Sequence, residues 1–257
     1  MLLLAVPVGL LIGLALGALG GGGSILAVPA LVYLLGQGAQ EATTGSLVVV
    51  GVAAASALVP QARAGRVRWR RGLVFSALGV AGSVAGSHLG SAVDPDVLLL
   101  GFSGVLLLAA GGMTLRRRRD GTGSEPASPR GRLACLWRTA LAATGVGLLT
   151  GFFGVGGGFV IVPALVIVLG FELPVAIGTS LLVIALNSAV ALAARSATHP
   201  DVDAVLVAVF AAAAVVGTWL GERTASRLPV ARLDAAFRAM LLLLAAAMGT
   251  SSLVALV

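Results

Sequence analysis

Long stretches without a charged side chain divide this chain of 257 residues. A helix needs about 20 apolar residues, each rising about 1.5 Å, to cross about 30 Å of hydrocarbon. This pattern predicts an all-α polytopic membrane protein. A soluble domain is excluded, because only 11% of the residues are charged, against about 25% in soluble domains. The stretches that approach or exceed the length of one span are 1–40, 42–62, 72–93, 97–115, 139–171, 173–194, 204–221 and 239–257.

Two of these stretches, 1–40 and 139–171, are too long for one helix and contain clusters of glycine. Gly20–Gly23 interrupt the first, and Gly154 with Gly156–Gly158 interrupt the second. We expect each stretch to form a pair of short or broken helices that meet at the glycines, which gives ten helical segments in all. A secretory signal peptide at the N-terminus is excluded, since no basic region precedes the apolar one.

The two glycine clusters belong to an internal repeat. Residues 17–36 read GALGGGGSILAVPALVYLLG, and residues 151–170 read GFFGVGGGFVIVPALVIVLG. Without gaps, 17–50 and 151–184 share 15 identical residues in 34. Apolar helices match easily by chance, but several glycines and a proline in register do not. The sequence therefore indicates a duplication.

The duplication predicts the domain organisation. Further along the chain, Gly86–Gly90 resembles Gly217–Gly221, at an offset of 131. We expect two transmembrane repeats, 1–115 and 133–257, joined by the polar Arg-rich linker 116–132. Each repeat holds about five helical segments. An odd number places the second repeat upside down relative to the first, which is the inverted-repeat plan of many secondary transporters.

The arginines predict the orientation in the membrane. If loop 63–71 is cytoplasmic, the linker 116–132 and loop 222–238 are cytoplasmic too, and 16 of the 17 arginines lie inside, with only Arg195 outside. This agrees with the positive-inside rule and places both termini outside the cytoplasm. The linker is better explained as a topology anchor than as a nucleic-acid or lipid site, so no nucleic-acid partner is expected.

The glycine breaks are the first candidate functional feature. Where a helix begins at such a break, its first N–H groups are unpaired and carry the positive end of the helix dipole. Irregular backbone at membrane depth is tolerated only where it is buried or lines a cavity. We therefore predict a transport site at the two breaks, with Pro29 and Pro163 breaking the short helices that follow. The alternative is close helix packing, which is the preferred explanation for Gly82, Gly86 and Gly90.

Hydroxyl and amide side chains that recur after the breaks are the second candidate feature. Each hydroxyl alone is more simply explained by a bond to a carbonyl one turn earlier. Asn187 either bridges helices or lines the transport path, and both alternatives remain open. The predicted substrate-binding residues are Gly20, Gly22, Gly23, Ser24, Thr44, Ser46, Gly154, Gly156, Gly157, Gly158, Thr179, Ser180 and Asn187.

The sequence offers little for enzymatic chemistry. It contains two histidines, one cysteine and no clustered carboxylates, so neither a metal site nor a covalent catalytic set is predicted. A phosphate-binding glycine loop would need a preceding strand and a following lysine, and the chain has no lysine. We expect no enzyme and no cofactor.

The duplicated glycine–proline block resembles the sulfite exporter TauE/SafE family of bacterial membrane proteins. The block runs here from Gly151 to Pro163 and is followed by Ala176–Leu181, which reads AIGTSL. The first half departs from this pattern, with Ser24 next to its glycines and ATTGSL at Ala42–Leu47. The resemblance covers essentially the whole chain except the linker.

The resemblance implies a multi-pass secondary transporter of the bacterial plasma membrane, expected to export small anions such as sulfite or organosulfonates. The expected partners are such an anion and the lipid bilayer. Because the apolar stretches contain no arginine, helix N-termini and hydroxyls would compensate the charge of the anion. Proton coupling, exchange and uniport remain open. A channel-like anion conduit and a non-transporting membrane assembly protein are the alternative functions.

Overall fold

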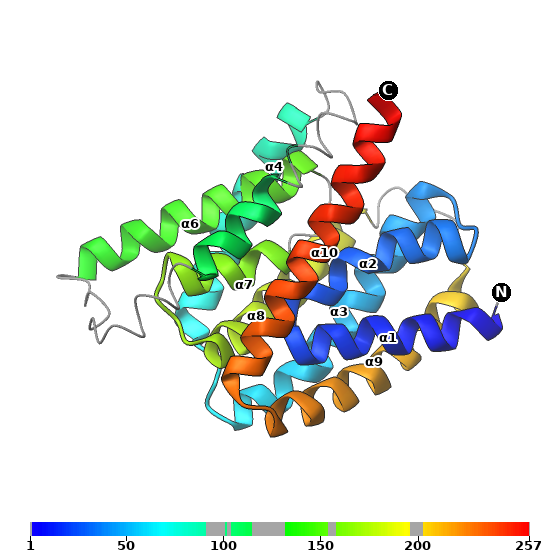
Figure 1. The fold of residues 1–257 in the computed structure, drawn as a ribbon, viewed down its shortest axis with the longest axis horizontal. Helices are drawn as coiled ribbons and strands as arrows, with labels where there is room; N and C mark the ends of the chain where they lie inside the picture. The colour runs from blue at the N-terminus through cyan, green and yellow to red at the C-terminus, as the bar shows by residue number, and fades with distance from the viewer. Residues whose placement is uncertain are drawn as a thin grey trace.

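The computed structural model describes residues 2–90, 101, 104–114, 132–153, 158–195 and 203–256, and every regular element in these ranges is helical (Figure 1). The first half of the chain forms α1 (Leu2–Leu19), a 3₁₀ turn (Gly20–Gly23), α2 (Ser24–Pro29), a π turn (Ala30–Leu34), α3 (Ala39–Arg63), α4 (Trp69–Gly90) and a helix over Gly104–Thr114. The second half forms α6 (Arg132–Phe153), α7 (Gly158–Ile167), α8 (Leu173–Arg195), α9 (Ala204–Arg227) and α10 (Val230–Leu256).

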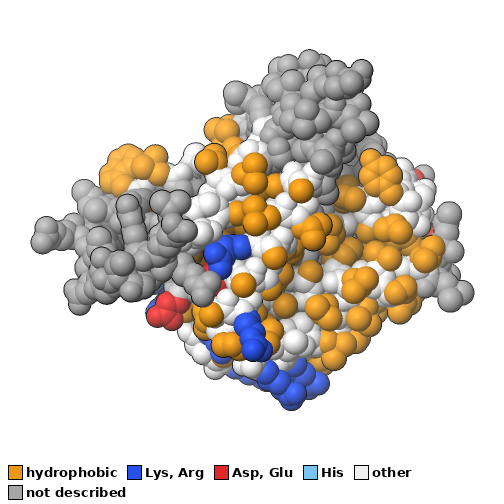
Figure 2. Space-filling view, in the orientation of Figure 1, with side chains coloured by type: hydrophobic (Ala, Val, Ile, Leu, Met, Phe, Trp, Pro, Cys, Tyr) orange, Lys and Arg blue, Asp and Glu red, His pale blue; other side chains and the backbone are white. Residues whose placement is uncertain are grey.

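The helices have the surface of a membrane protein. Within the described ranges, four helical segments are long and apolar enough to cross a bilayer: Leu4–Leu34, Gln40–Arg63, Leu173–Ala194 and Ala204–Arg227. Large apolar side chains cover the face seen in Figure 2, and the arginines on this face gather toward its lower edge. Exposure of so many apolar side chains is stable in lipid and not in water. The prediction of an all-α multi-pass membrane protein is confirmed.

The first helix of each half packs against a helix of the other half. The first helix of the first half, α1, packs along α9 of the second half, and the two run parallel, side by side (Figure 1). Gly9, Gly13 and Gly17 lie one turn apart on α1. A Cβ at Gly13 would overlap the backbone of Ala214, and one at Gly17 would overlap that of Thr218. Glycine at this spacing lets the two backbones touch, as in small-xxx-small contacts between membrane helices.

The first helix of the second half makes the reciprocal contact. α6 packs along α4 of the first half with the same parallel orientation. A Cβ at Gly147 would overlap the backbone of Gly79, and one at Gly151 would overlap that of Ser83. Gly147 and Gly151 follow Gly13 and Gly17 by 134 positions, the offset of the sequence repeat. Equivalent glycines therefore serve equivalent interfaces in the two halves.

These interfaces correct one detail of the repeat. Gly82 packs against the carbonyl of Thr144, and Gly217 packs against the carbonyl of Leu10. Leu10 and Thr144 are equivalent at the offset of 134, so Gly82 is the counterpart of Gly217. The offset of 131 that the sequence suggests is wrong here by one helical turn. Glycines recur every four residues in both helices, so a shift of one turn aligns them equally well.

The turns before α3 and α8 also match. Gly36 has φ 65° and Gly170 has φ 74°, and both positions end a helical segment in the left-handed region. The N–H of Gln37 donates to the carbonyl of Leu31 at 3.0 Å, and the N–H of Phe171 donates to that of Leu165 at 3.1 Å. This is the Schellman pattern of helix ends, and glycine adopts it without a steric penalty.

The first of the two expected helix breaks is found, whereas most of the second, at 154–157, lies outside the described residues. Gly20 has φ 73° and ends α1, and α2 ends at Pro29, where the missing N–H lets the chain widen into a π turn. Pro163, by contrast, lies inside α7, which continues to Ile167. Pro163 therefore does not end its helix, and a kink at this proline stays a prediction.

The charged connections are shorter than the sequence suggests. Only Leu228 and Pro229 join α9 to α10, where we expected a loop over 222–238. Asp234 and Arg238 lie one turn apart on α10 and form an ion pair of 3.1 Å. Such i, i+4 pairs stabilise helix at the polar ends of membrane spans, so a charged segment need not be a loop.

Candidate functional site

A cavity of about 410 Å³ lies between α3, α4, α6 and α8, with α2 and α7 at one end. No charged side chain lines it among the described residues. Its wall is mostly aliphatic, and Phe75 is the one aromatic side chain among the lining residues that the structure describes. A neutral, partly polar cavity at membrane depth is the kind of site in which a transporter holds a small substrate. Its polar lining consists of Ser24, Thr43, Ser46, Ser83, Thr150, Asn187 and Ser188.

The cavity runs from the surface toward the middle of the protein. At one end, Val84, Val190 and Ala194 are exposed. At the other end, Ser24 and Gly158 are buried. As the described residues form it, the cavity is therefore a pocket with one buried end.

The two halves meet at the buried end of the cavity. Gly21, in the first glycine break, contacts Gly158, which begins α7 after the second break. A Cβ at Gly21 would overlap the carbonyl of Gly158, so the close approach requires glycine. The hydroxyl of Ser24 lies beside Gly158 and donates to the carbonyl of Gly21 at 2.7 Å. The first break and the start of α7 thus form one wall.

Asn187 joins two helices across the cavity wall. The hydroxyl of Ser76 on α4 donates to Oδ1 of Asn187 on α8 at 2.6 Å. The bond orients the amide with Oδ1 toward Ser76, and the amide nitrogen, which carries the N–H donors, lies near Gly79 of the cavity lining. Asn187 therefore bridges two helices and also lines the cavity, and that it lines a transport path stays a prediction.

Four hydroxyls of the lining bond to their own helices. Thr43 donates to the carbonyl of Gln40, Ser46 to that of Thr43, Ser83 to that of Val80 and Thr150 to that of Val146, at 2.7–2.9 Å. These are the back-bonds that hydroxyls ordinarily make in membrane helices. Each hydroxyl can rotate its proton toward a ligand, and it then no longer donates to the carbonyl of its own helix.

The structure brings four of the predicted site residues to the cavity: Ser24, Ser46, Gly158 and Asn187. Thr44, Thr179 and Ser180 do not line it. All three are buried, and Thr179 and Ser180 are fully enclosed. Gly154, Gly156 and Gly157 lie outside the described residues.

The remaining glycines of the first break have packing functions. Gly20 lies against Ser180 and Ile177 of α8. Gly22 faces Met240 of α10, and Gly23 faces Ile12 and Leu16 of α1. Of these, only Gly20 has a positive φ. None of the three is among the cavity-lining residues.

Sequence reasoning missed four polar residues of this region: Ser76, Ser83, Thr150 and Ser188. Two of them carried a usable signal, because Ser83 follows Gly82 and Thr150 precedes Gly151, and those glycines hold α4 against α6. Ser188 is next to Asn187. Among the described residues, no group of three or more histidine, cysteine or acidic side chains could hold a metal ion.

Comparison with known proteins yields one family over nearly the whole chain. Residues 5–248 match the family described as "Sulfite exporter TauE/SafE". A "Probable membrane transporter protein" of Xylella fastidiosa (strain Temecula1 / ATCC 700964) is 36% identical over 232 residues, covering 90% of this chain and 87% of that protein. The "Probable membrane transporter protein YdhB" of Bacillus subtilis (strain 168) is 26% identical over 227 residues, covering 88% and 91%. No solved structure matches significantly.

Proposed function

The chain belongs to the sulfite exporter TauE/SafE family, and from this premise we propose that it is a secondary transporter of small oxyanions such as sulfite or organosulfonates, acting as an exporter. That it is a multi-pass membrane transporter follows from the family and the apolar helices. The substrate, the direction and the site are the proposal.

The observation that carries the proposal is the cavity bounded by Asn187 and by the start of α7. Asn187 offers N–H donors, and Gly158 places the start of α7, with the positive end of its helix dipole, in the same lining. Both features favour an anion. With no basic side chain among the described lining residues, an anion would be held loosely enough to be released, as turnover requires.

We propose that the halves 1–115 and 133–257 are inverted repeats joined by the linker 116–132. The support is threefold: the equivalent turns at Gly36 and Gly170, the glycine interfaces at an offset of 134, and the exchange of partners between α1–α9 and α4–α6. A two-fold axis in the membrane plane relates such repeats in many transporters.

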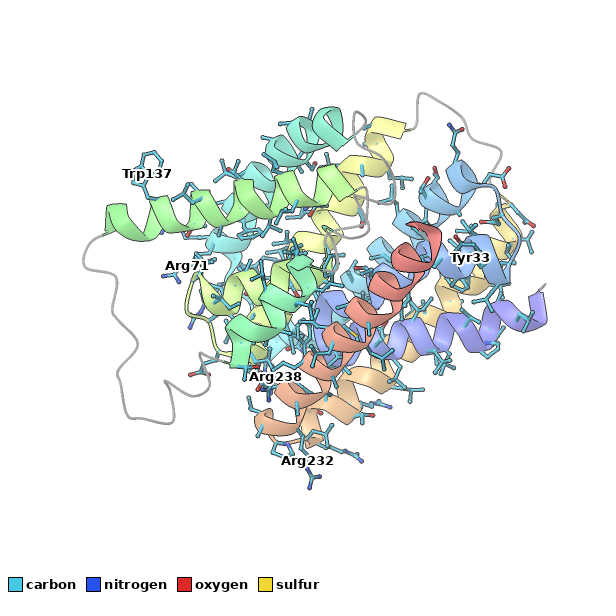
Figure 3. The ribbon with its side chains drawn as sticks, turned by 45° about the horizontal axis from the view of Figure 1, so that its top comes forward. Tyr33, Arg71, Trp137, Arg232 and Arg238 are labelled. Atoms are coloured by element: carbon cyan, nitrogen blue, oxygen red, sulfur yellow. The ribbon has the colours of Figure 1, made fainter. Side chains whose placement is uncertain are left out.

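We propose that the cavity opens to the outside of the cell and that both termini lie outside. Arg71, Arg232 and Arg238 lie along one side of the molecule, and Tyr33 lies on the opposite side (Figure 3). The arginine side is the cytoplasmic one by the positive-inside rule. The exposed end of the cavity is formed by the C-terminal parts of α4 and α8, far from the arginine-rich connection between α3 and α4.

The proposal is tested with purified protein in liposomes. Sulfite, sulfate, thiosulfate, methanesulfonate and acetate are compared as substrates, with and without a pH gradient. We expect saturable flux of sulfite or a sulfonate above that of acetate. Flux of none of these anions would contradict the proposal. Flux that rises linearly with concentration would favour a channel-like conduit.

A further inference from the structure

The cavity occupies only half of the surface between α3 and α8, and the other half is packed shut. We propose, on the basis of the transport function above, that the packed half is the inner half of the transport path and that the loop Ala64–Arg68 is its gate, held closed by Thr179. The equivalence of the two halves, a buried amide and the contacts of the loop support this assignment.

One face of α3 is continuous from the cavity into the packed region. Its residues follow one another at intervals of three and four, which places them on one side of the helix. Thr43, Leu47 and Val50 line the cavity. Ala54 and Ala57, further along the same face, have no exposed surface.

The equivalent face of α8 has the reverse arrangement. Ile177 and Leu181 are buried, Ile184 reaches the cavity, and Ser188 and Ala191 line it. These residues follow their α3 counterparts by 134 positions. Ser188 and Ala191 line the cavity, whereas their counterparts on α3 are buried. Ile177 and Leu181 are buried, whereas their counterparts on α3 line the cavity. Two equivalent half-paths in opposite states are what alternating access requires of an inverted repeat.

Gln61 continues the packed face of α3 by one further turn. Its side chain is 4% exposed, and no donor among the described residues reaches its Oε1. A buried amide oxygen without a partner is costly, and such groups are rare in native structures. Opening of the packed half would expose this oxygen to water. The free-energy cost of leaving it unpaired here is explained if water hydrates it in the state in which the packed half is open.

The loop after α3 covers this end of the packed region. The N–H of Arg66 donates to the carbonyl of Gln61 at 3.1 Å, and Gly178 of α8 leaves room for the carbonyl of Arg66, which a Cβ would approach to 2.8 Å. Val67, in the middle of the loop, is buried. The loop is therefore seated on both α3 and α8.

Thr179 holds the loop in place. Its Oγ1 accepts a hydrogen bond from the N–H of Arg68 at 3.2 Å and donates to the carbonyl of Val175 at 2.7 Å. This is a side-chain bond between the loop and α8, whereas the neighbouring Ser180 bonds only to its own helix, at the carbonyl of Ile177. Thr179 is thus a positioning residue for the gate and not a ligand of the anion.

The test compares two equivalent alanines, Ala57 on α3 and Ala191 on α8. Each is replaced by cysteine in the full chain, with the single natural cysteine, Cys135, changed to alanine. A membrane-impermeant methanethiosulfonate is applied from either side of the vesicles. Ala110→Cys is the matched control, because Ala110 is also buried but belongs to the helix Gly104–Thr114 and not to the faces of α3 and α8.

We expect Ala191→Cys to react from the outside and Ala57→Cys from the inside. Adding Thr179→Val should raise the inner reaction rate of Ala57→Cys about fivefold, the effect of losing one hydrogen bond, and lower the outer rate of Ala191→Cys. Gly178→Ala, which pushes the loop away without removing a bond, should act in the same direction and serves if Thr179→Val does not fold.

The inference would be overturned if Ala57→Cys did not react from the inside in a protein that transports. It would also be overturned if Thr179→Val and Gly178→Ala left the reaction rates of Ala57→Cys and Ala191→Cys unchanged. A reaction of Ala110→Cys as fast as that of Ala57→Cys would overturn it too, because it would indicate general loosening of the fold. Reciprocal changes at Ala57→Cys and Ala191→Cys without flux of any anion would support the gate and contradict the proposed function instead.

Discussion

Ser76 on α4 and Asn187 on α8 are 111 positions apart in the sequence and are joined by a hydrogen bond of 2.6 Å from the Ser76 hydroxyl to the amide oxygen of Asn187. The bond holds the amide oxygen toward Ser76, so the amide nitrogen is the end that can face the cavity. It thus links the contact between the two halves of the chain to the polarity of the proposed substrate site.

Replacing Asn187 by aspartate tests that polarity. Asn187→Asp puts a carboxylate in place of the N–H donors, and two like charges about 4 Å apart repel by several kcal/mol even at the effective dielectric of a protein surface. We expect anion flux to fall at least about tenfold. Flux is measured in liposomes, with Asn187→Gln as the neutral control of similar polarity. Equal flux in Asn187→Asp and the natural protein would rule out an anion beside this side chain.

Removing the hydroxyl that orients the amide should have a smaller effect. In Ser76→Ala, Oδ1 of Asn187 loses its donor, and the amide is free to turn its oxygen toward the substrate. We expect a higher apparent KM for the anion, with the maximal flux little changed. Ser56→Ala is the control, because Ser56 bonds only to the carbonyl of Ala53 on its own helix. The same KM in both variants would show that Ser76 does not orient Asn187.

The glycine interface between α4 and α6 predicts opposite effects for two neighbouring glycines. A Cβ at Gly147 would overlap the backbone of Gly79, so Gly147→Ala must separate the helices, at a cost of about 1–3 kcal/mol or more. Gly145 has no atom of another segment within 4 Å of its Cβ position. Gly145→Ala should therefore be neutral or stabilising by about 0.5–1 kcal/mol through helix propensity. Thermal stability in detergent, followed by loss of the monodisperse peak, compares the two. Equal stability of both variants would contradict the close contact.

The first glycine break predicts a similar contrast. Gly21→Ala places a methyl group on the backbone of Gly158, which cannot yield, and should abolish flux. Gly22→Ala meets the end of the Met240 side chain, which can rotate away, and should retain most of the flux. A transport assay on both variants, with protein amount matched by quantitative blot, measures the difference. Loss of flux in Gly22→Ala alone would place the essential contact at α10 instead.

Cys135 tests the orientation. The arginine distribution places the start of α6 in the cytoplasm. A membrane-impermeant maleimide should therefore fail to label the natural protein in intact cells and should label it after permeabilisation. Efficient labelling of intact cells would invert the topology and turn the exposed end of the cavity toward the cytoplasm.

The class of fold and the break at Gly20 were predictable, because each depends on a local property. Charge-free stretches reflect the thickness of the bilayer, and a glycine cluster inside such a stretch marks a place where a helix cannot continue normally. The turn at Gly36 and Gly170 repeats in sequence as well as in structure, and this made the duplication visible.

The cavity lining was less predictable, because it depends on which helices become neighbours. Ser83 and Thr150 line the same cavity because α4 of one half packs on α6 of the other. No local sequence pattern predicts this packing. Thr179 is the converse case. Its recurrence after the glycine–proline block suggested a ligand, whereas its hydroxyl is enclosed and bonded to the N–H of Arg68. Sequence equivalence of the two halves could not show that equivalent positions of α3 and α8 differ, with some lining the cavity and others buried.

The most direct test of the central claim is counterflow of radiolabelled sulfite in proteoliposomes. A secondary transporter that alternates between two half-paths should take up labelled sulfite transiently against its gradient when the vesicles are preloaded with unlabelled sulfite, and Asn187→Asp should abolish this uptake. Uptake that is unaffected by preloading and does not saturate would contradict alternating access through this cavity.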